Sequence, residues 1–201
     1  MAKLERTKTS YHKDDLRQTL LTEARHHLIE VGPDHLSLRE IARRAKVSPR
    51  APYRHFESKD SLLAAIAAEG FQTLTQQFRD VAVSEPNERL RRMARLYVEF
   101  ARAHPAVFRL MFSPVLQRLE PEGTAMIAFE QLVAVARDLH PPGFGLRHWT
   151  TMATALWSGL HGMATISNDG ASTLYSSEVF IEPEALVDAI VRGWRYENPT
   201  T

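Results

Sequence analysis

The sequence predicts an all-α protein with a three-helix N-terminal head and a larger helical C-terminal body. Apolar residues recur at spacings of three and four, as on one face of a helix, and no strand pattern or internal repeat occurs. Gly-Pro, Ser-Pro and His-Pro pairs separate these patterns. With 201 residues, 44% hydrophobic and 24% charged, the chain has room for two domains. We place them at residues 1–60 and 61–201.

The head begins with a helix that ends at Gly32-Pro33, where glycine supplies the cap and proline bars continuation. Its apolar stripe is Leu16, Leu20, Ala24, Leu28 and Val31. Ser37 and Glu40 then form the pattern of a capping box at the start of a second helix. That helix is about two turns long, too short to be stable alone, so another element must pack on it.

The body is predicted as a series of helices separated by proline-containing breaks. Ser58 caps the first of them, which carries Leu62, Leu63, Ile66, Phe71 and Leu74. The later helices are expected over residues 90–101, 106–112, 123–139, 147–168 and 183–196. Residues 169–177, rich in Gly, Ser and Thr, are expected to form a loop.

Composition excludes several kinds of protein. The chain has no cysteine, so it forms no disulfide or thiolate metal site, and its charged N-terminus does not resemble a signal peptide. Residues 148–168 carry no charge, but only 10 of these 21 residues are apolar, fewer than a membrane span requires. We therefore expect a cytoplasmic protein without a membrane partner. Residues 1–60 have a net charge of +4 and the remainder −3, a weak indication of nucleic-acid binding at one end.

Residues 46–60, KVSPRAPYRHFESKD, place basic and aromatic side chains where a core cannot hold them all. A two-turn helix, a four-residue turn and a second short helix form a helix-turn-helix, whose second helix enters the major groove of DNA. Arginine can pair with guanine, and hydroxyl, imidazole or cationic groups can bind phosphates. These residue types are supplied by Ser48, Pro49, Arg50, Ala51, Tyr53, Arg54, His55 and Lys59. The alternative is a core helical hairpin with incidental surface charge.

The stretch SLREIARRAKVSPRAPYRHFESKDSLLAAI resembles the DNA-binding head of the TetR family of bacterial transcriptional regulators, over residues 16–66. The resemblance implies that Tyr53, His55 and Lys59 contact the DNA backbone. It implies reading positions at Arg50, Ala51 and Arg54, and further backbone contacts at Ser37 and Arg39, where a helix starts.

Two residues depart from the family pattern. Lys46 stands where many members have glycine in the turn, and Pro52 replaces an aliphatic residue before the tyrosine. Both changes bear on the geometry of the reading helix. The N-terminal arm is a separate question: it either adds phosphate or minor-groove contacts or is a solvated tail. Its basic residues are Lys3, Arg6, Lys8 and Lys13.

In the C-terminal half, the segment Trp157-Ser158-Gly159-Leu160-His161-Gly162 resembles a Trp-His-Gly signature of one subgroup of the family. The resemblance implies a homodimer in which the two C-terminal helices form a four-helix interface with their symmetry mates. The residues agree, because an uncharged helix needs burial on nearly all faces, and Gly159 and Gly162 permit close helix approach.

The body helices also carry aromatic and methionine side chains that suit a flat, apolar effector. The candidates are Tyr97, Phe100, Phe108, Met111, Phe112, Met126, Phe129, Trp157 and His161. The alternative is that these residues simply form the core. For His161 three roles stay open: a core histidine, an interface contact or a hydrogen bond to a ligand.

No enzyme signature occurs, neither a metal-binding histidine spacing nor a nucleophile elbow nor a phosphate-binding loop. We predict no catalytic residue, metal or cofactor. An architectural DNA binder would carry more positive charge and no large body, and a purely structural helical dimer would not bind DNA. The prediction is a repressor released from a palindromic double-stranded DNA operator by a small apolar ligand. A ligand-independent DNA-binding protein or an activator is the alternative.

Overall fold

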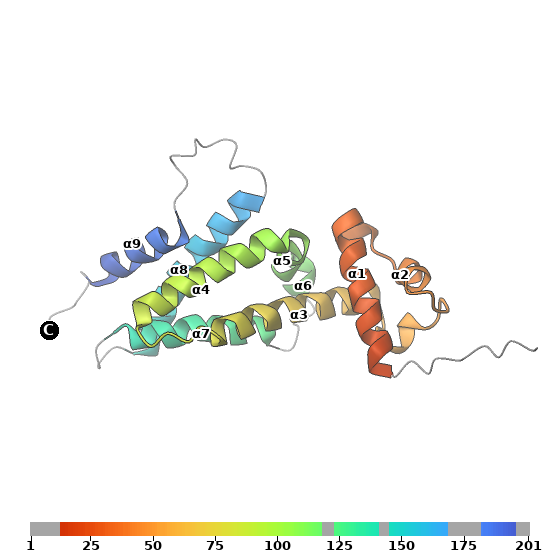
Figure 1. Ribbon diagram of the computed structural model, residues 1–201, viewed down its shortest axis with the longest axis horizontal. Coiled ribbons are helices and arrows are strands. Elements are labelled where there is room, and N and C mark those ends of the chain that lie inside the picture. The colour runs from red at the N-terminus through yellow and green to blue at the C-terminus, as the bar shows by residue number, and fades with distance from the viewer. Residues whose placement is uncertain (1–12, 118–122, 141–144, 169–181, 196–201) are drawn as a thin grey trace, which may run out of the picture. The chain divides into compact units, whose positions relative to one another are not determined.

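In the computed structural model, the described residues are 13–117, 123–140, 145–168 and 182–195, and all regular secondary structure within them is helical (Figure 1). The all-α prediction is confirmed. Contacts divide the chain into two compact units, residues 1–66 and 67–201, and the division falls within helix α3, Lys59–Arg79. The predicted basic arm and the loop over residues 169–177 lie outside the described residues, apart from the backbone of Lys13.

The N-terminal unit consists of α1 (Lys13–His35), α2 (Leu38–Arg44), a 3-10 turn, η1 (Pro52–Arg54), and the beginning of α3. Helix α2 packs against both α1 and η1, which is how a helix of only seven residues is stabilised. The core of the unit is fully apolar at its centre. It contains Leu20, Leu21, Ala24, Leu28, Ile41, Ala42, Phe56, Leu62, Leu63 and Ile66.

Helix α1 is broken at Gly32, as the sequence predicts. Gly32 has φ 74° and ψ 174°, a conformation open to glycine and costly for residues with a side chain, and Pro33 follows it directly. A further helical turn then runs to His35 before α2 begins.

The predicted capping box at α2 is wrong, whereas the predicted cap at α3 is confirmed. Ser37 has extended backbone and accepts the Ile41 N–H at 3.0 Å through its carbonyl, but its side chain makes no capping bond. The Glu40 carboxylate instead accepts hydrogen bonds from Arg43, at 2.8 Å from Nε, because guanidinium groups lie one turn away. At α3, the Ser58 hydroxyl accepts the Ser61 N–H at 3.1 Å.

The body helices begin and end close to the predicted proline breaks. After α3 they are α4 (Pro86–Ala103), α5 (Pro105–Met111), α6 (Pro114–Gln117), α7 (Thr124–Asp138), α8 (Leu146–Asn168) and α9 (Pro183–Arg195). Helix α8 packs against α4, α7 and α9, and α4 also packs against α5, α7 and α9. Helices α4, α5, α6 and α9 each start at a proline. Proline suits the first turn because an N–H at that position would have no acceptor within the helix.

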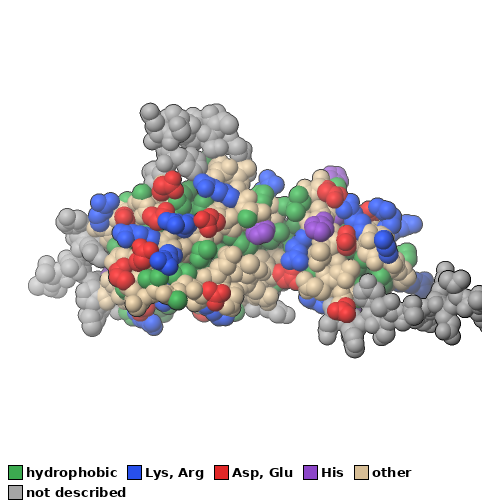
Figure 2. Space-filling view, in the orientation of Figure 1, with side chains coloured by type: hydrophobic (Ala, Val, Ile, Leu, Met, Phe, Trp, Pro, Cys, Tyr) green, Lys and Arg blue, Asp and Glu red, His purple; other side chains and the backbone are tan. Residues whose placement is uncertain are grey.

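Ion pairs join the outer surfaces of α4 and α9. Arg91 Nε donates to Asp188 at 2.8 Å, and Arg95 pairs with Glu184. Figure 2 shows the acidic and basic side chains interleaved over these two helices. The pairs are solvent-exposed, so each contributes little stability and mainly fixes how α9 lies on α4. None of the described helices combines the length and the hydrophobicity that crossing a membrane requires.

Candidate DNA-binding surface and ligand cavity

The segment after α2 presents its polar side chains to solvent. Ser48, Pro49, Arg50, Tyr53 and Arg54 are exposed, with 56% of the Tyr53 surface accessible. Ala51, His55 and Lys59 are half-buried, and Ser37 and Arg39 at the start of α2 are exposed. Pro52 and Phe56 face the core and anchor the segment. The ten predicted DNA-contacting residues are therefore accessible, wholly or in part.

The predicted second helix of the motif is one 3-10 turn rather than an α-helix. Ala51 N–H donates to the Ser48 carbonyl at 2.9 Å and His55 N–H to the Pro52 carbonyl at 2.9 Å, both three residues apart. Pro52 has no N–H to donate to Ser48, so an α-helical bond cannot form at that position. The departure noted at Pro52 thus tightens the reading segment.

Lys46 closes α2 in a conformation that glycine usually adopts. Its φ is 55°, the one positive φ among the described non-glycine residues. Val47 N–H donates to the Ala42 carbonyl at 3.0 Å and Lys46 N–H to the Arg43 carbonyl at 3.2 Å, the bond pattern of a Schellman motif. The turn therefore keeps its geometry without glycine, at a cost in backbone strain.

The arginines of the N-terminal unit divide into paired and unpaired groups. Arg44 donates to Glu30 at 2.9 Å, which joins α2 to α1, and Arg43 pairs with Glu40. Hydrogen bonds from Arg44 and from Arg43 hold the pKa of Glu30 and of Glu40, respectively, at about 2. By contrast, within the described residues no carboxylate pairs with the exposed arginines of the candidate surface. These are Arg39, Arg50 and Arg54.

Lys59 links the start of α3 to the last turn of α1. Its Nζ donates to the Asp34 carbonyl at 2.8 Å, which leaves two of its three ammonium donors available. Figure 2 shows the basic side chains exposed on this unit. The site thus combines unpaired guanidinium groups, a phenol and an ammonium group on one polar segment of the N-terminal unit.

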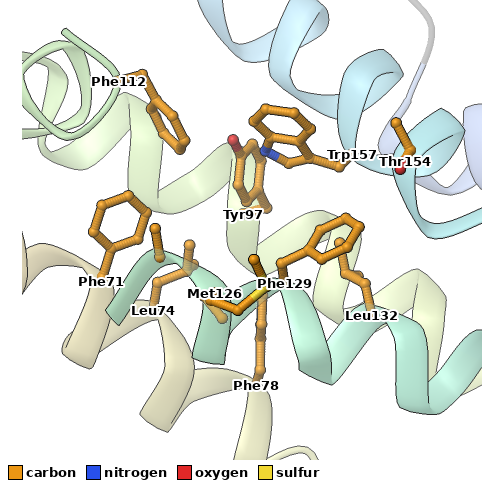
Figure 3. A pocket seen from close by; sticks show the side chains of 12 residues that line it. Phe71, Leu74, Phe78, Tyr97, Phe112, Met126, Phe129, Leu132, Thr154 and Trp157 are labelled. Atoms are coloured by element: carbon orange, nitrogen blue, oxygen red, sulfur yellow. The ribbon is translucent and has the colours of Figure 1, made fainter. Parts of the chain in front are cut away.

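The body contains an apolar cavity of about 290 Å³ between α3, α4, α7 and α8. Figure 3 shows aromatic rings from all four helices directed into one space. The lining residues are Phe71, Leu74, Phe78, Tyr97, Phe112, Ala125, Met126, Ala128, Phe129, Leu132, Thr154 and Trp157. A second hollow of about 650 Å³ adjoins it, since the two share Phe71, Phe112, Ala125, Met126 and Trp157.

Seven of the nine predicted ligand residues line one of these spaces. Tyr97, Phe112, Met126, Phe129 and Trp157 line the cavity, and Met111 and His161 line the adjoining hollow. Phe100 and Phe108 do not line either space, and both are almost fully buried in the core. The Phe108 ring packs against Tyr97, Phe112 and His161, so it supports the wall from behind.

The sequence analysis did not identify the cavity-lining residues of α3, several of those on α7, and one threonine of α8. The missed residues are Phe71, Leu74, Phe78, Ala125, Ala128, Leu132 and Thr154. The signal was present in the apolar spacing of α3, but nothing in that spacing distinguishes a residue that lines a cavity from one in a solid core. Only the packing of four helices separates the two.

A hydrogen bond joins a residue that lines the cavity to a residue that lines the adjoining hollow. The Tyr97 hydroxyl lies 2.9 Å from His161 Nδ1. Burial raises the pKa of Tyr97 well above its ordinary range, and a hydrogen bond from Trp157 acts in the opposite direction. Burial also lowers the pKa of His161, so its imidazole is neutral near pH 7.

Helix α8 is buried on one side only within a single chain. Its buried face carries Met152, Ala153, Leu156, Leu160 and Ala164, whereas Thr151, Ser158 and Ile166 are exposed. A Cβ added at Gly159 would lie 3.1 Å from Leu186 of α9, and one added at Gly162 would meet nothing within 4 Å. Gly159 therefore serves contact inside the chain, while Gly162 leaves an uncharged face of α8 open.

No group of three or more His, Asp or Glu side chains within the described segments could hold a metal ion. Comparison with known proteins then defines the class. Residues 20–66 match the family described as bacterial regulatory proteins, tetR family. Residues 90–193, more than half of the chain, match the tetracyclin repressor-like C-terminal domain. The chain therefore belongs to the TetR family.

Solved structures of similar fold cover nearly the whole chain. A protein of unknown function from Rhodococcus sp. RHA1 is 28% identical, with a TM-score of 0.69 over 94% of this chain and 98% of that one. The TetR-family transcriptional regulator PfmR from Thermus thermophilus is 22% identical, with a TM-score of 0.60 over 86% and 97%. A single-substitution variant of TetR from Acinetobacter baumannii AYE, solved with minocycline, is 19% identical, with a TM-score of 0.66 over 89% and 96%.

The family assignment settles the general activity. TetR-family members are transcriptional regulators that bind DNA and act as dimers, and they are not enzymes. This confirms the family predicted from the head motif and the prediction of a non-enzymatic DNA-binding protein.

Proposed function

We propose that this protein is a homodimeric repressor that binds a palindromic operator and leaves it when a small apolar effector enters the body cavity. Residues 1–60 act as the DNA-binding domain and residues 61–201 as the effector-binding and dimerisation domain. A regulator of this kind acts where bacterial DNA lies, in the cytoplasm.

The observation that carries the proposal is the set of unpaired cations on the segment after α2. Arg43 and Arg44 are neutralised by Glu40 and Glu30, whereas Arg50 and Arg54 are exposed and paired with no carboxylate among the described residues. Unpaired arginines can pair with guanine edges, and charge that no carboxylate neutralises attracts phosphates.

We assign the individual roles by chemistry. Arg50, Ala51 and Arg54 read bases, because arginine offers a bidentate donor pair and alanine allows close approach. Ser37, Arg39, Tyr53, His55 and Lys59 contact the DNA backbone, because each offers a donor to phosphate. Ser48 and Pro49 lie at the start of the reading segment and contact the DNA where this segment enters the major groove.

Dimerisation through α8 and α9 is supported by the uncharged face that α8 exposes around Gly162. Exposed Ala185 and Ala189 extend the small-residue surface onto α9. Small residues let partner helices approach closely, and twofold symmetry places two reading segments on two half-sites about one DNA turn apart.

Effector control is supported by the cavity and by the path of α3. Phe71, Leu74 and Phe78 of α3 line the cavity, and the same helix begins at Lys59 in the N-terminal unit. A ligand that favours one position of α3 shifts the population toward dimers whose heads no longer match the operator. The similar TetR variant from Acinetobacter baumannii was solved in complex with minocycline.

The test is selection of bound fragments from random double-stranded DNA by the purified full-length protein. A palindromic consensus with two equivalent half-sites supports both the reading segment and the dimer. Recovery of sequences without symmetry or consensus contradicts the proposal. The selected operator then allows Arg50→Ala to be compared on specific and random DNA.

A further inference from the structure

The polar groups that line the ligand spaces gather at one end. Ser113 and His161 line the hollow, whereas the cavity deeper between α3 and α7 is walled by Phe78, Phe129 and Leu132. The Thr154 hydroxyl donates to the Thr150 carbonyl at 2.7 Å, so it is satisfied within α8. Among the described lining residues no Lys, Arg, Asp or Glu occurs.

The hydrogen bond of Tyr97 indicates which nitrogen of His161 carries its hydrogen. A buried hydroxyl hydrogen without an acceptor is unfavourable, and the hydrogen bond of the Tyr97 hydroxyl among the described residues joins it to His161. The hydroxyl hydrogen of Tyr97 is then directed to His161 Nδ1, 2.9 Å away. Nδ1 is therefore an acceptor, and the neutral imidazole carries its hydrogen on Nε2.

Two donors at this end of the site have no partner in the part of the chain that the structure describes. Within the described residues no group accepts a hydrogen bond from His161 Nε2. The Ser113 Oγ is buried and has no hydrogen-bond partner among the same residues. A buried hydroxyl without a partner is unfavourable, and a ligand oxygen would relieve it.

We infer that the effector is an uncharged molecule with a flat apolar body and one oxygen acceptor, such as a ketone or ester carbonyl, bound by His161 Nε2–H and Ser113 Oγ–H. The apolar body lies among the rings shown in Figure 3. An ionised ligand would lose its hydration without meeting an opposite charge on any described lining residue. The inference rests on the proposed role of the cavity as the effector site.

The test uses three naphthalene probes and calorimetry on the full-length protein. 2-Acetylnaphthalene offers a carbonyl, 2-isopropenylnaphthalene replaces its oxygen by CH2 in nearly the same shape, and 2-naphthoate is an anion. One net hydrogen bond predicts roughly 2- to 12-fold tighter binding of the ketone than of the alkene. Naphthoate is expected to bind more weakly than either.

Variants separate the polar end from the apolar end. His161→Leu and Ser113→Ala are each expected to reduce the preference for the ketone, and the double variant is expected to abolish it. The matched control is Phe129→Leu, which removes apolar contact and is expected to weaken ketone and alkene by the same factor. Loss of the ketone preference in Phe129→Leu, or its full survival in the double variant, would overturn the inference.

A second measurement needs no ligand and no variant. Nitrogen-15 NMR of histidine-labelled protein reports the tautomer of His161, and we expect neutral imidazole with hydrogen on Nε2. An Nδ1–H tautomer, equal binding of ketone and alkene, or tightest binding of naphthoate each overturns the inference and leaves the proposed function standing. Failure of all three probes to bind contradicts the cavity as an effector site, and the inference then falls with the proposed function.

Discussion

The two candidate sites of this protein are built in opposite ways. The DNA-binding surface lies mostly on residues 48–59 of one exposed segment, and its side chains face solvent. The ligand cavity draws on α3, α4, α7 and α8, which span residues 59–168, and is almost entirely apolar. The first site depends on charge left unpaired at a surface, and the second on space left unfilled inside a core.

This difference separates function from stability. Removal of a side chain on an exposed segment changes the folding free energy little but lowers the affinity for DNA. A side chain in the cavity wall is also part of the core, so its removal affects folding and ligand binding together. The substitutions below test that separation.

The largest effect is expected for Phe108→Ala in the body. Phe108 is 2% exposed and packs against Tyr97 and Phe112, so truncation leaves a void behind the cavity wall. We expect a loss of about 3–5 kcal/mol in the free energy of unfolding, measured by urea denaturation. Met126→Ala, at a side chain that is 58% exposed, is the control and should change stability far less. Equal losses would contradict the distinction between a buried side chain behind the cavity wall and an exposed side chain that lines the cavity.

The head should show the opposite behaviour in Arg50→Ala. We expect specific DNA binding to weaken by about 1–3 kcal/mol and base preference to relax, with little change in stability. Lys59→Ala should weaken binding to specific and random DNA alike and reduce the salt dependence by about one phosphate contact. Equal losses on both DNAs for Arg50→Ala would contradict its role as a base reader.

Gly162→Leu tests whether the exposed face of α8 forms the dimer interface. A Cβ added at this position meets nothing within 4 Å inside the chain, so a side chain has room to begin there and we expect the monomer to fold normally. At a packed dimer interface the added volume should cost about 1–3 kcal/mol of association, visible by analytical ultracentrifugation. Gln72→Leu, also exposed but on α3, is the control. An unchanged dimer would place the interface elsewhere.

The head could be predicted from sequence because its signals are local. Gly32-Pro33 marks the break in α1, and Pro49 and Pro52 mark the segment whose basic side chains cannot enter the core. The capping box failed because the Arg43 and Arg44 side chains bind Glu40, and pattern spacing does not rank competing partners.

The body could be predicted only in part. Its helix starts at Pro86, Pro105 and Pro183 are visible in the sequence, whereas Pro114 is predicted only as a break and the short helix α6 that begins there is not predicted. The outline of the cavity could not be predicted, as two neighbouring phenylalanines illustrate. Phe108 lies on α5 and is buried behind the cavity wall, whereas Phe112, at the end of the same helix, lines the cavity. That difference arises from tertiary packing, which helical periodicity does not encode.

A smaller effect is expected for Lys46→Gly. A non-glycine residue in the left-handed region destabilises the folded state by about 1–2 kcal/mol. Glycine removes this strain but offsets about 0.5–1 kcal/mol of the gain, because its unfolded state has more conformational freedom to lose. The net expectation is a gain of about 0 to 1.5 kcal/mol in the free energy of unfolding, measured by thermal and urea denaturation. Lys46→Ala keeps the strain and should give no such gain.

The smallest effect concerns acid stability of the head. Arg44 and Arg43 lower the pKa of Glu30 and Glu40 from 4.5 to about 2. The folded state holds these carboxylates ionised, so their contribution is complete above about pH 4.5 and is lost as the pH falls towards 2. Replacing both by glutamine should flatten the stability between about pH 5 and 2, measured by circular dichroism, whereas Glu57→Gln should not.

The most direct measurement uses the absence of cysteine from the chain. Ser48→Cys, a near-isosteric change at an exposed position, is labelled with an iron chelate that cleaves nearby DNA, and the complex with the selected operator is mapped. The account predicts two clusters of cuts, related by twofold symmetry and about one helical turn apart or a multiple of it. The same label at Thr73→Cys on the body part of α3 should give weaker, scattered cuts. Cleavage from residue 73 with none from residue 48 would contradict the account.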